Sequence, residues 1–480
     1  MTDVLLYIAG AWCEGESTTP LTDKYSGAPV ASVHRPSRAQ VDTALAALAE
    51  AQAASRWSPY ERYEVLARAS TLLASRRADV ARTIVLDSGF TITDAGREVD
   101  RAVQTLLLSA EEAKRIVGEM VPVDAAPGAG ERLAFTVLRP LGVVCAITPF
   151  NSPLNTVLHK VAPALAAGNA VLLKPASLTP LTAELVVRVL LEAGVPGGLL
   201  SVVYGTGRDV GQWLLESDVP SFYAFTGSTA VGEHIHRTIG LRRAQLEMGS
   251  LSSTIVCEDA DLGYCLPLCV NAAFRKAGQV CTSVQRLYVH QAVIGDVLNT
   301  LREMLAGREV GDPSRVETFV GPLISPAEAD RVTSWVRAAC DAGAKVVFGG
   351  GRDGAVVEPT VLTGVAPDMQ VMCDEVFGPV VVVRGFDDLD RAIDEVNDTP
   401  YGLAAGLFTN DLDHALTAAG RLRMGSVHIN GTSSSRVDLM PYTGVKSSGL
   451  GREGPHWAVR EMSEERLVTI GRMGNGKRGI

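Results

Sequence analysis

Apolar residues recur at helical spacing in the first quarter of the chain. Residues 39–56 repeat Ala, Leu and Val after Ser37, which is a candidate helix cap. Residues 61–118 continue this pattern, with a break near Ser88. Residues 119–140 change character, because Pro and Gly separate two short apolar runs. This change predicts two strands that form a protruding hairpin.

From residue 141 onward, short apolar runs alternate with helical patterns. Such alternation indicates a parallel, doubly wound α/β sheet that binds its ligand at the carboxyl ends of the strands. A second α/β stretch runs from about 251 to 445, and the strand-like run 466–470 could pair with the 119–140 hairpin, within one subunit or across two. The predicted strands are 143–147, 170–173, 200–204, 253–256, 286–289, 345–348 and 380–383, and the predicted helices of the first stretch are 154–167 and 180–194.

Length and charge exclude several classes of protein. A chain of 480 residues predicts about three domains, or two with an appendage. The net charge is -10 and there is no run of Lys or Arg, so we expect no nucleic-acid partner. No stretch reaches the roughly eighteen apolar residues that a membrane span needs. The apolar run 4–9 follows no basic region, so it is a poor signal peptide, and we expect a cytoplasmic protein.

The first candidate catalytic residue is a cysteine. The eight Cys form no CxxC pair and no zinc spacing with the eight His, so we predict no metal site and expect most thiols to be buried and inert. Cys281 differs, because Gly, small and polar residues surround it between Lys276 and Ser283. This context favours an exposed loop and a thiol that can attack an electrophilic carbon.

Two further polar residues suit acyl chemistry. Asn151 follows the strand 143–147 between two prolines, where a rigid amide could stabilise an oxyanion, although an Asn can also serve a turn. Glu247 stands among apolar and small residues, so burial could raise its pKa and make it a general base near neutral pH. A structural, salt-bridged Glu is the alternative.

Other residues at strand ends suit a dinucleotide. Lys174 and Ser177 could hydrogen-bond a ribose or phosphate, and the small residues of 225–232 allow a pyrophosphate to approach a helix N-terminus. Glu375 and Phe377, two residues apart, would point the same way in extended backbone, toward a ribose and a nicotinamide. No GxGxxG occurs at these turns, which disfavours a standard Rossmann dehydrogenase.

Six motifs in this order resemble the aldehyde dehydrogenase superfamily, over about residues 5 to 470. They are Pro149-Phe150-Asn151, Lys174-Pro175-Ala176-Ser177, Phe225-Thr226-Gly227-Ser228, Glu247-Met248-Gly249, Gly278-Gln279-Val280-Cys281 and Glu375-Val376-Phe377-Gly378-Pro379. The resemblance implies the fold of that family and a homodimer or homotetramer. The implied parts are an NAD(P)-binding domain (1–118 and 141–250), a catalytic domain (251–445) and an oligomerisation hairpin with a C-terminal strand (119–140 and 446–480).

The resemblance also implies a role for each matched residue. Cys281 is then the nucleophile, Asn151 and the Cys281 N–H form the oxyanion hole, and Glu247 activates the water that hydrolyses the thioester. Many members have Glu where Ser177 stands, so NADP is allowed as well as NAD. The implied cofactor-binding residues are Ile147, Pro149, Lys174, Ser177, Gly207, Gly211, Phe225, Gly227, Ser228, Glu375 and Phe377.

The segment 430–446 resembles a subgroup that includes lactaldehyde, succinate-semialdehyde, phosphonoacetaldehyde and non-phosphorylating glyceraldehyde-3-phosphate dehydrogenases. Arg97, Arg101 and Arg436 could face the substrate funnel and bind a carboxylate, phosphate or phosphonate, which predicts a small anionic aldehyde. Structural ion pairs are the alternative for these arginines. A CoA-acylating enzyme and a non-catalytic scaffold are the alternative functions; Glu247 argues against the first, and the presence of Cys281, Asn151 and Glu247 together argues against the second.

Overall fold

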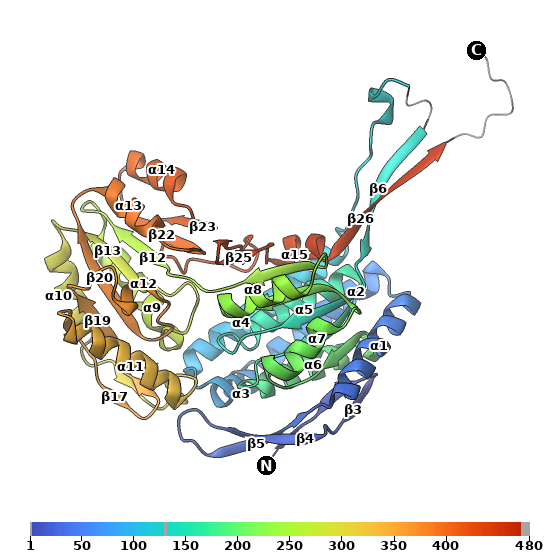
Figure 1. Ribbon diagram of the computed structural model, residues 1–480, viewed down its shortest axis with the longest axis horizontal. Helices are drawn as coiled ribbons and strands as arrows, with labels where there is room; N and C mark the ends of the chain where they lie inside the picture. The colour runs from blue at the N-terminus through green and yellow to red at the C-terminus, as the bar shows by residue number, and fades with distance from the viewer. Residues whose placement is uncertain (1, 129–131, 472–480) are drawn as a thin grey trace.

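The computed structural model describes residues 2–128 and 132–471, and it contains two large sheets, each with a hydrophobic core (Figure 1). Residues 129–131 of the predicted hairpin 119–140, and the end of the 446–480 segment from 472, lie outside the described residues. No helix in the described part of the chain has both the length and the apolar character needed to cross a membrane. The α/β class predicted from the sequence is confirmed.

The first sheet has the strand order β25-β11-β10-β7-β8-β9-β2-β3, and β7 through β11 run parallel. The chain leaves β7 toward β8 and β9 on one side and returns to β10 and β11 on the other. The carboxyl edge of β7 and β10 is therefore the switch point at which such sheets bind ligands. The bounds are β2 Leu6–Ile8, β3 Ala11–Cys13, β7 Val143–Ile147, β8 Ala170–Lys174, β9 Leu200–Val202, β10 Pro220–Thr226, β11 Arg243–Glu247 and β25 Gly449–Leu450.

The second sheet has the order β16-β19-β20-β13-β12-β22-β23, in which only the edge strand β16 is antiparallel. Near-continuous runs of Val in β20 fit strands that are buried on both faces. The bounds are β12 Ser253–Val256, β13 Arg286–His290, β16 Lys345–Phe348, β19 Thr360–Thr363, β20 Val380–Phe386, β22 Ala404–Phe408 and β23 Ser426–Ile429.

The predicted helices are confirmed, and local signals set their ends. Ser37 makes a capping box at the start of the first helix. The stretch predicted as 61–118 divides into three helices, because Arg76 leaves helical geometry and Gly89 adopts φ 75°. The bounds are α1 Arg38–Ala54, α2 Pro59–Ser75, α3 Arg77–Ser88, α4 Ile92–Ala113, α5 Asn155–Ala167, α6 Pro180–Ala193, α7 Gln212–Glu216, α8 Thr229–Thr238, α9 Leu262–Phe274, α10 Ile294–Leu305, α11 Pro326–Asp341, α12 Gln370–Cys373, α13 Leu389–Asn397, α14 Leu412–Arg421 and α15 Pro455–Glu461.

Short elements complete the described chain. They are the 3-10 helices η1 Val123–Ala125, η2 Gly197–Leu199 and η4 Arg275–Gly278, the π-helix η3 Gly207–Gly211, and the strands β1 Thr2–Val4, β4 Ser17–Thr22, β5 Pro29–Arg35, β14 Glu309–Val310, β15 Thr318–Val320, β17 Arg352–Asp353, β18 Val356–Val357, β21 Tyr401–Gly402 and β24 Val445–Lys446.

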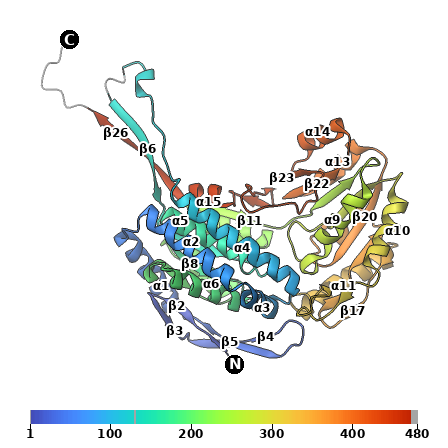
Figure 2. The same ribbon diagram turned by 180° about the vertical axis from the view of Figure 1, so that it is seen from behind.

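The protruding element is a two-stranded ribbon that combines distant parts of the chain. β6 (Arg132–Pro140) pairs antiparallel with β26 (Ser463–Gly471) within the same chain, and Figures 1 and 2 show both projecting from the body of the molecule. The prediction of a strand around Pro122 was wrong. That segment makes one isolated bridge, between Met120 and Phe135, and then the turn η1, because Pro122 has no N–H to donate to a ladder.

The segment that precedes β26 joins the first core. β25 pairs with β11, and Ala458, Val459 and Met462 pack into the same cluster as the first sheet. The tail therefore contributes to the first sheet and its core as well as to the ribbon.

Candidate active site

A cavity of about 440 Å³ brings the predicted chemistry together. Cys281, Asn151 and Glu247 all line it, although they come from three different segments. All three arginines predicted to face a substrate funnel, Arg97, Arg101 and Arg436, line it as well. The remaining lining residues are Asp94, Glu98, Ser152, Asn155, Thr156, His159, Thr226, Leu268, Asn271, Ala272, Arg275, Lys276, Val280, Thr282, Thr432, Ser434, Ser435, Tyr442 and Glu453.

Cys281 lies in the loop between η4 and β13. Just before this loop, η4 holds Lys276 and Ala277 in left-handed backbone at φ 52° and 53°, followed by Gly278 at φ 70°. A Cβ on Gly278 would lie 2.1 Å from the Gly378 carbonyl oxygen, so only glycine lets these two loops pack together.

The prediction of an exposed loop was wrong, because Cys281 is half-buried where these loops pack together. Ser252 fixes the loop further by donating a hydrogen bond to the Cys281 carbonyl at 3.0 Å. Burial, and then the neighbouring Glu247 carboxylate, raise the pKa of the Cys281 thiol well above its ordinary value. The thiol therefore needs local stabilisation before it can react as a thiolate.

Glu247 ends β11 and is buried. Burial first, and the neighbouring Glu453 carboxylate second, raise the pKa of Glu247 to about 7. Its Oε1 atom is buried and accepts no hydrogen bond from the residues of the described chain. A carboxyl with this pKa can exchange a proton with water near neutral pH. The predicted pKa rise is confirmed, and the salt-bridged alternative is not observed among the described residues.

Asn151 follows β7 and is buried in the wall that it shares with Cys281. Lys276 holds this turn, because its Nζ donates to the Asn151 carbonyl oxygen at 2.8 Å and pairs with Glu98 at 2.5 Å. The Asn151 turn is thus tied to the segment that carries Cys281.

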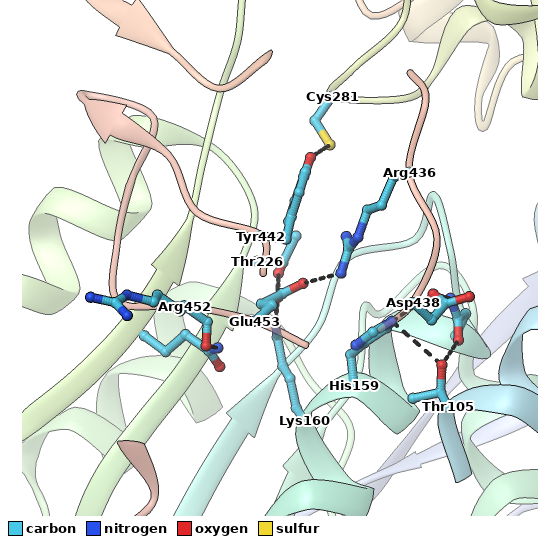
Figure 3. A network of polar contacts seen from close by, with 12 residues as sticks. Thr105, His159, Lys160, Thr226, Cys281, Arg436, Asp438, Tyr442, Arg452 and Glu453 are labelled. Carbon is cyan, nitrogen blue, oxygen red and sulfur yellow. Dashed lines mark hydrogen bonds and ion pairs between the residues drawn. The ribbon is translucent and has the colours of Figure 1, made fainter. Parts of the chain in front are cut away.

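A buried ion network around Glu453 borders the same cavity (Figure 3). Lys160 of α5 is fully buried and donates to Glu453 Oε1 and to Thr226 Oγ1, both at 2.7 Å. Arg436 lies 3.5 Å from the other Glu453 oxygen. Although burial alone would raise it, the charges of Lys160 and Arg436 lower the pKa of Glu453 to about 2. Glu453 is therefore a permanent negative charge near Glu247. The sequence alone does not single out Lys160 or Glu453.

The arginines of the cavity have different partners. Arg101 makes a two-pronged contact with Asp438, at 2.7 and 3.1 Å, and Arg436 pairs with Glu453. The alternative of structural ion pairs is therefore confirmed for both arginines. Arg97 is exposed; it donates to Asn271 Oδ1 at 3.2 Å and lies 3.9 Å from the Asp94 carboxylate, so it also has an ion-pair partner. Arg275, which the sequence analysis missed, donates to Ser434 Oγ at 2.6 Å and forms no ion pair with a carboxylate of the described residues.

Burial lowers the pKa of the Arg275 guanidinium, and nearby Arg101 adds to this effect. A half-buried cation with no carboxylate partner is a ready site for a substrate anion. The one sequence signal for Arg275 is its place directly before Lys276, at the start of the Cys281 motif.

The predicted dinucleotide residues lie along the carboxyl edge of the first sheet. Ile147 and Lys174 end β7 and β8, and Ser228 is the N-terminal cap of α8 after β10. Burial lowers the pKa of Lys174 to about 8. Ser177 is exposed and donates to the Gly205 carbonyl oxygen at 2.7 Å.

Glycines keep this edge open to a ligand. Nothing lies within 4 Å of a Cβ placed on Gly207, which opens η3, whereas at Gly227 a Cβ would meet the Phe225 ring at 2.5 Å. Gly211 closes η3 beside Lys174, and Pro149 stands in the loop after β7. An exposed hydroxyl, a cationic amine and the start of a ten-residue helix fit the ribose and pyrophosphate of a dinucleotide.

Glu375 and Phe377 border a second, small cavity together with Cys281. The prediction of extended backbone here was wrong, since Phe377 has φ 48° in the left-handed region. Its ring packs edge-on against Phe150, with centroids 5.8 Å apart. The Ser250 N–H donates to Glu375 at 3.2 Å, and burial raises the pKa of Glu375 to about 8. A sharp turn at Phe377 therefore places both residues beside the thiol, and the alternation of side chains along an extended strand does not.

Among the described residues, one group of potential metal ligands lies near the second sheet. Ligand atoms of Cys257, Asp259 and His414 lie within 4.8 Å of one another. The Asp259 carboxylate already accepts hydrogen bonds from Thr409 Oγ1 and the Asn410 N–H. These contacts give Asp259 a role in holding the loop after β22.

The fold and the site define an oxidoreductase that uses NAD or NADP. Residues 12–468 match the model of the aldehyde dehydrogenase family, and the chain belongs to this family. The predictions of the family, of aldehyde oxidation and of a nicotinamide cofactor are thereby confirmed.

Relatives and solved structures resemble the whole chain. A 3-sulfolactaldehyde dehydrogenase from Priestia aryabhattai is 47% identical over 97% of each chain. Aldehyde dehydrogenase 21 from Physcomitrella patens, solved with its reaction product succinate, is 33% identical with a TM-score of 0.95 over 99% of each chain. An NADP-dependent glyceraldehyde-3-phosphate dehydrogenase from Bacillus halodurans, solved with NADP, is 32% identical with a TM-score of 0.95, over 98% of this chain and 99% of its own.

Proposed function

We propose that the protein oxidises a small anionic aldehyde to a carboxylic acid through a covalent thioester on Cys281. The observation that carries this proposal is the composition of one cavity. It holds a thiol, a carboxyl with a pKa of about 7 and a half-buried arginine, Arg275, without a carboxylate partner in the described chain. These groups suit nucleophilic attack, water activation and anion binding.

In this proposal the Cys281 thiolate adds to the aldehyde carbon. The Asn151 side-chain amide and the Cys281 N–H donate to the oxygen that becomes negatively charged. A nicotinamide bound beside Glu375 and Phe377 would supply the hydride acceptor for the oxidation of this adduct to a thioester. Glu247 then takes a proton from the water that attacks the thioester carbon, which releases the acid and restores the thiol.

The cofactor residues divide by the part of the dinucleotide that they would meet. Lys174 and Ser177 suit the adenosine ribose, and Ser228 at the start of α8 suits the pyrophosphate. Glu375 and Phe377 suit the nicotinamide riboside, because they border the small cavity next to Cys281. Ser177 presents a hydroxyl where a carboxylate would repel a 2′-phosphate, so this edge accepts NADP as well as NAD. The remaining residues of this path are Ile147, Pro149, Gly207, Gly211, Phe225 and Gly227.

The anionic group of the substrate could be a sulfonate, a carboxylate or a phosphate. The names of the relatives and neighbours mention a sulfonated aldehyde, succinate and a phosphorylated aldehyde. Arg275 presents a planar fork that matches any of these groups. We propose a sulfonated three-carbon aldehyde as the first substrate to test, because the 3-sulfolactaldehyde dehydrogenase is 47% identical to this chain.

Arg275→Gln tests this proposal in steady-state kinetics with matched anionic and neutral aldehydes. We expect the KM for the anionic aldehyde to rise about tenfold to a hundredfold, because a charge-assisted hydrogen bond is lost, while the KM for propanal stays the same. Arg384→Gln is the control, since Arg384 pairs with Glu395 away from the cavity. An unchanged KM for every anionic aldehyde in the Arg275 variant would contradict the anion site.

We also propose the division into an NAD(P)-binding domain (1–118 and 141–250), a catalytic domain (251–445) and an oligomerisation element (119–140 and 446–480), with a homodimer or homotetramer as the assembled state. The two separate cores support the division, and the exposed Leu133, Leu467 and Ile470 on the ribbon support self-association. Eight free cysteines support a reducing, cytoplasmic location. Light scattering of Leu467→Glu tests the assembly, since a loss of oligomer is expected.

A further inference from the structure

Tyr442 contacts the proposed nucleophile directly. Its hydroxyl oxygen lies 3.2 Å from Cys281 Sγ, within hydrogen-bond distance for sulfur. The ring is buried, and Figure 3 shows it extending from the loop after β23 toward the thiol. The residues are 161 positions apart in sequence, so the contact belongs to the folded site.

The backbone holds Tyr442 in this position. The Tyr442 N–H donates to the Glu453 carbonyl oxygen at 3.1 Å, and the Glu453 N–H donates to the Tyr442 carbonyl oxygen at 2.7 Å. The Glu453 side chain is itself fixed by Lys160 at 2.7 Å. The ring is thus anchored to a buried ion pair, and its hydroxyl has little freedom to leave Sγ.

Arg436 makes the hydroxyl a stronger donor. Its guanidinium carbon lies 3.8 Å from the centroid of the Tyr442 ring. A cation over the ring face attracts the π electrons and so favours proton donation by the hydroxyl. The charge of Arg436 also acts to lower the pKa of Tyr442, against the larger effect of burial, which raises it.

Cys281 needs such a donor. Its pKa is raised by burial and by Glu247, and its hydrogen bond with Tyr442 is the contact that acts to lower it. No His or Lys side chain forms a hydrogen bond with Sγ in the described chain.

We propose that the Tyr442 hydroxyl donates a hydrogen bond to the Cys281 thiolate, stabilises it and aims it at the aldehyde carbon. This inference rests on the proposed role of Cys281 as nucleophile and adds a residue to it. The sulfur loses its negative charge when the C–S bond forms, so the hydroxyl is needed mainly before and during attack. The donor acts on sulfur, and its effect is therefore independent of the anionic group of the substrate.

The test is the pH dependence of Cys281 alkylation by iodoacetamide in the enzyme without aldehyde, with the labelled peptide identified by mass spectrometry. In Tyr442→Phe, we expect the midpoint of the alkylation profile to rise by about one pH unit, which is about a tenfold slower reaction at pH 7. The ring and the backbone contacts remain, so the melting temperature should change little. Tyr288→Phe is the matched control, because that buried hydroxyl has no hydrogen-bond partner among the described residues.

Kinetics supply the second measurement. Tyr442→Phe should lower kcat/KM for anionic and neutral aldehydes by the same factor, whereas a role in holding the substrate anion would affect only the anionic ones. Identical alkylation midpoints in Tyr442→Phe and wild type would overturn the role of Tyr442 and leave the nucleophile intact. Absence of any labelling at Cys281 in the wild type would overturn the proposed function itself.

Discussion

The proposed role of Glu247 predicts how the rate of thioester hydrolysis depends on pH. The Glu247 pKa of about 7 means that about a tenth of the molecules carry the carboxylate at pH 6 and about nine tenths at pH 8. If Glu247 is the base that activates water, the rate of thioester hydrolysis should rise about tenfold across this interval and then level off. The carboxylate is the active form, so the rate falls as pH decreases through 7.

Glu247→Gln removes the base and keeps the size of the side chain. Stopped-flow absorbance of the reduced nicotinamide should then show one rapid turnover per active site, followed by a steady state that is about a hundredfold to ten-thousandfold slower. The variant should also lose the rise in hydrolysis rate between pH 6 and 8. Glu184→Gln is a suitable control, because Glu184 is a buried carboxyl that pairs with Arg188 on α6.

Two results would refute this reasoning. A Glu247→Gln enzyme with an unchanged steady-state rate would show that another group activates water. A variant without the rapid first turnover would show that Glu247 acts before or during hydride transfer, since a base needed only for hydrolysis leaves the first turnover intact.

Two further predictions concern the cofactor and the ion network. Ser177→Glu should raise the KM for NADP at least about tenfold and spare NAD, because the new carboxylate repels a 2′-phosphate; equal effects on both cofactors, measured by initial rates, would contradict the placement of Ser177. Asp438→Asn should lower the free energy of unfolding by about 3–5 kcal/mol in urea titrations at pH 7, because buried Asp438 pairs with Arg101 and His159. Although burial opposes it, these partners hold the folded-state pKa of Asp438 below its unfolded value, so its stabilisation is present above the unfolded pKa and is lost as pH falls toward the folded one. A variant as stable as wild type at pH 7 would refute this.

Local patterns were enough for most helices and strands. Ser37 caps α1 as its sequence context indicates, and the Val run of β20 appears as a buried strand. These local patterns gave wrong predictions where a single residue determined the backbone conformation. Pro122 ended a strand that the apolar run suggested, and Phe377 adopted a left-handed conformation that extended spacing does not anticipate.

The cavity was predictable only in part, for a physical reason. Cys281, Glu247 and Asn151 were found because each stands in a recognisable local motif. Tyr442 was missed because its importance comes from its contact with Cys281, which is 161 positions away in sequence. No local sequence pattern indicates such a contact. Arg275 was missed because its importance is the lack of a carboxylate partner in the described chain, and that depends on all the chain segments around it.

The buried pair of Lys160 and Glu453 has a consequence for how the protein is made. Lys160 emerges from the ribosome almost three hundred residues before the carboxylate that neutralises it, since the two are 293 positions apart. Until then a chain that closed its first core would hold an uncompensated buried cation, which costs several kcal/mol. A chain cut short before residue 453 should therefore have a less stable first core and be digested by proteases more readily than the full chain.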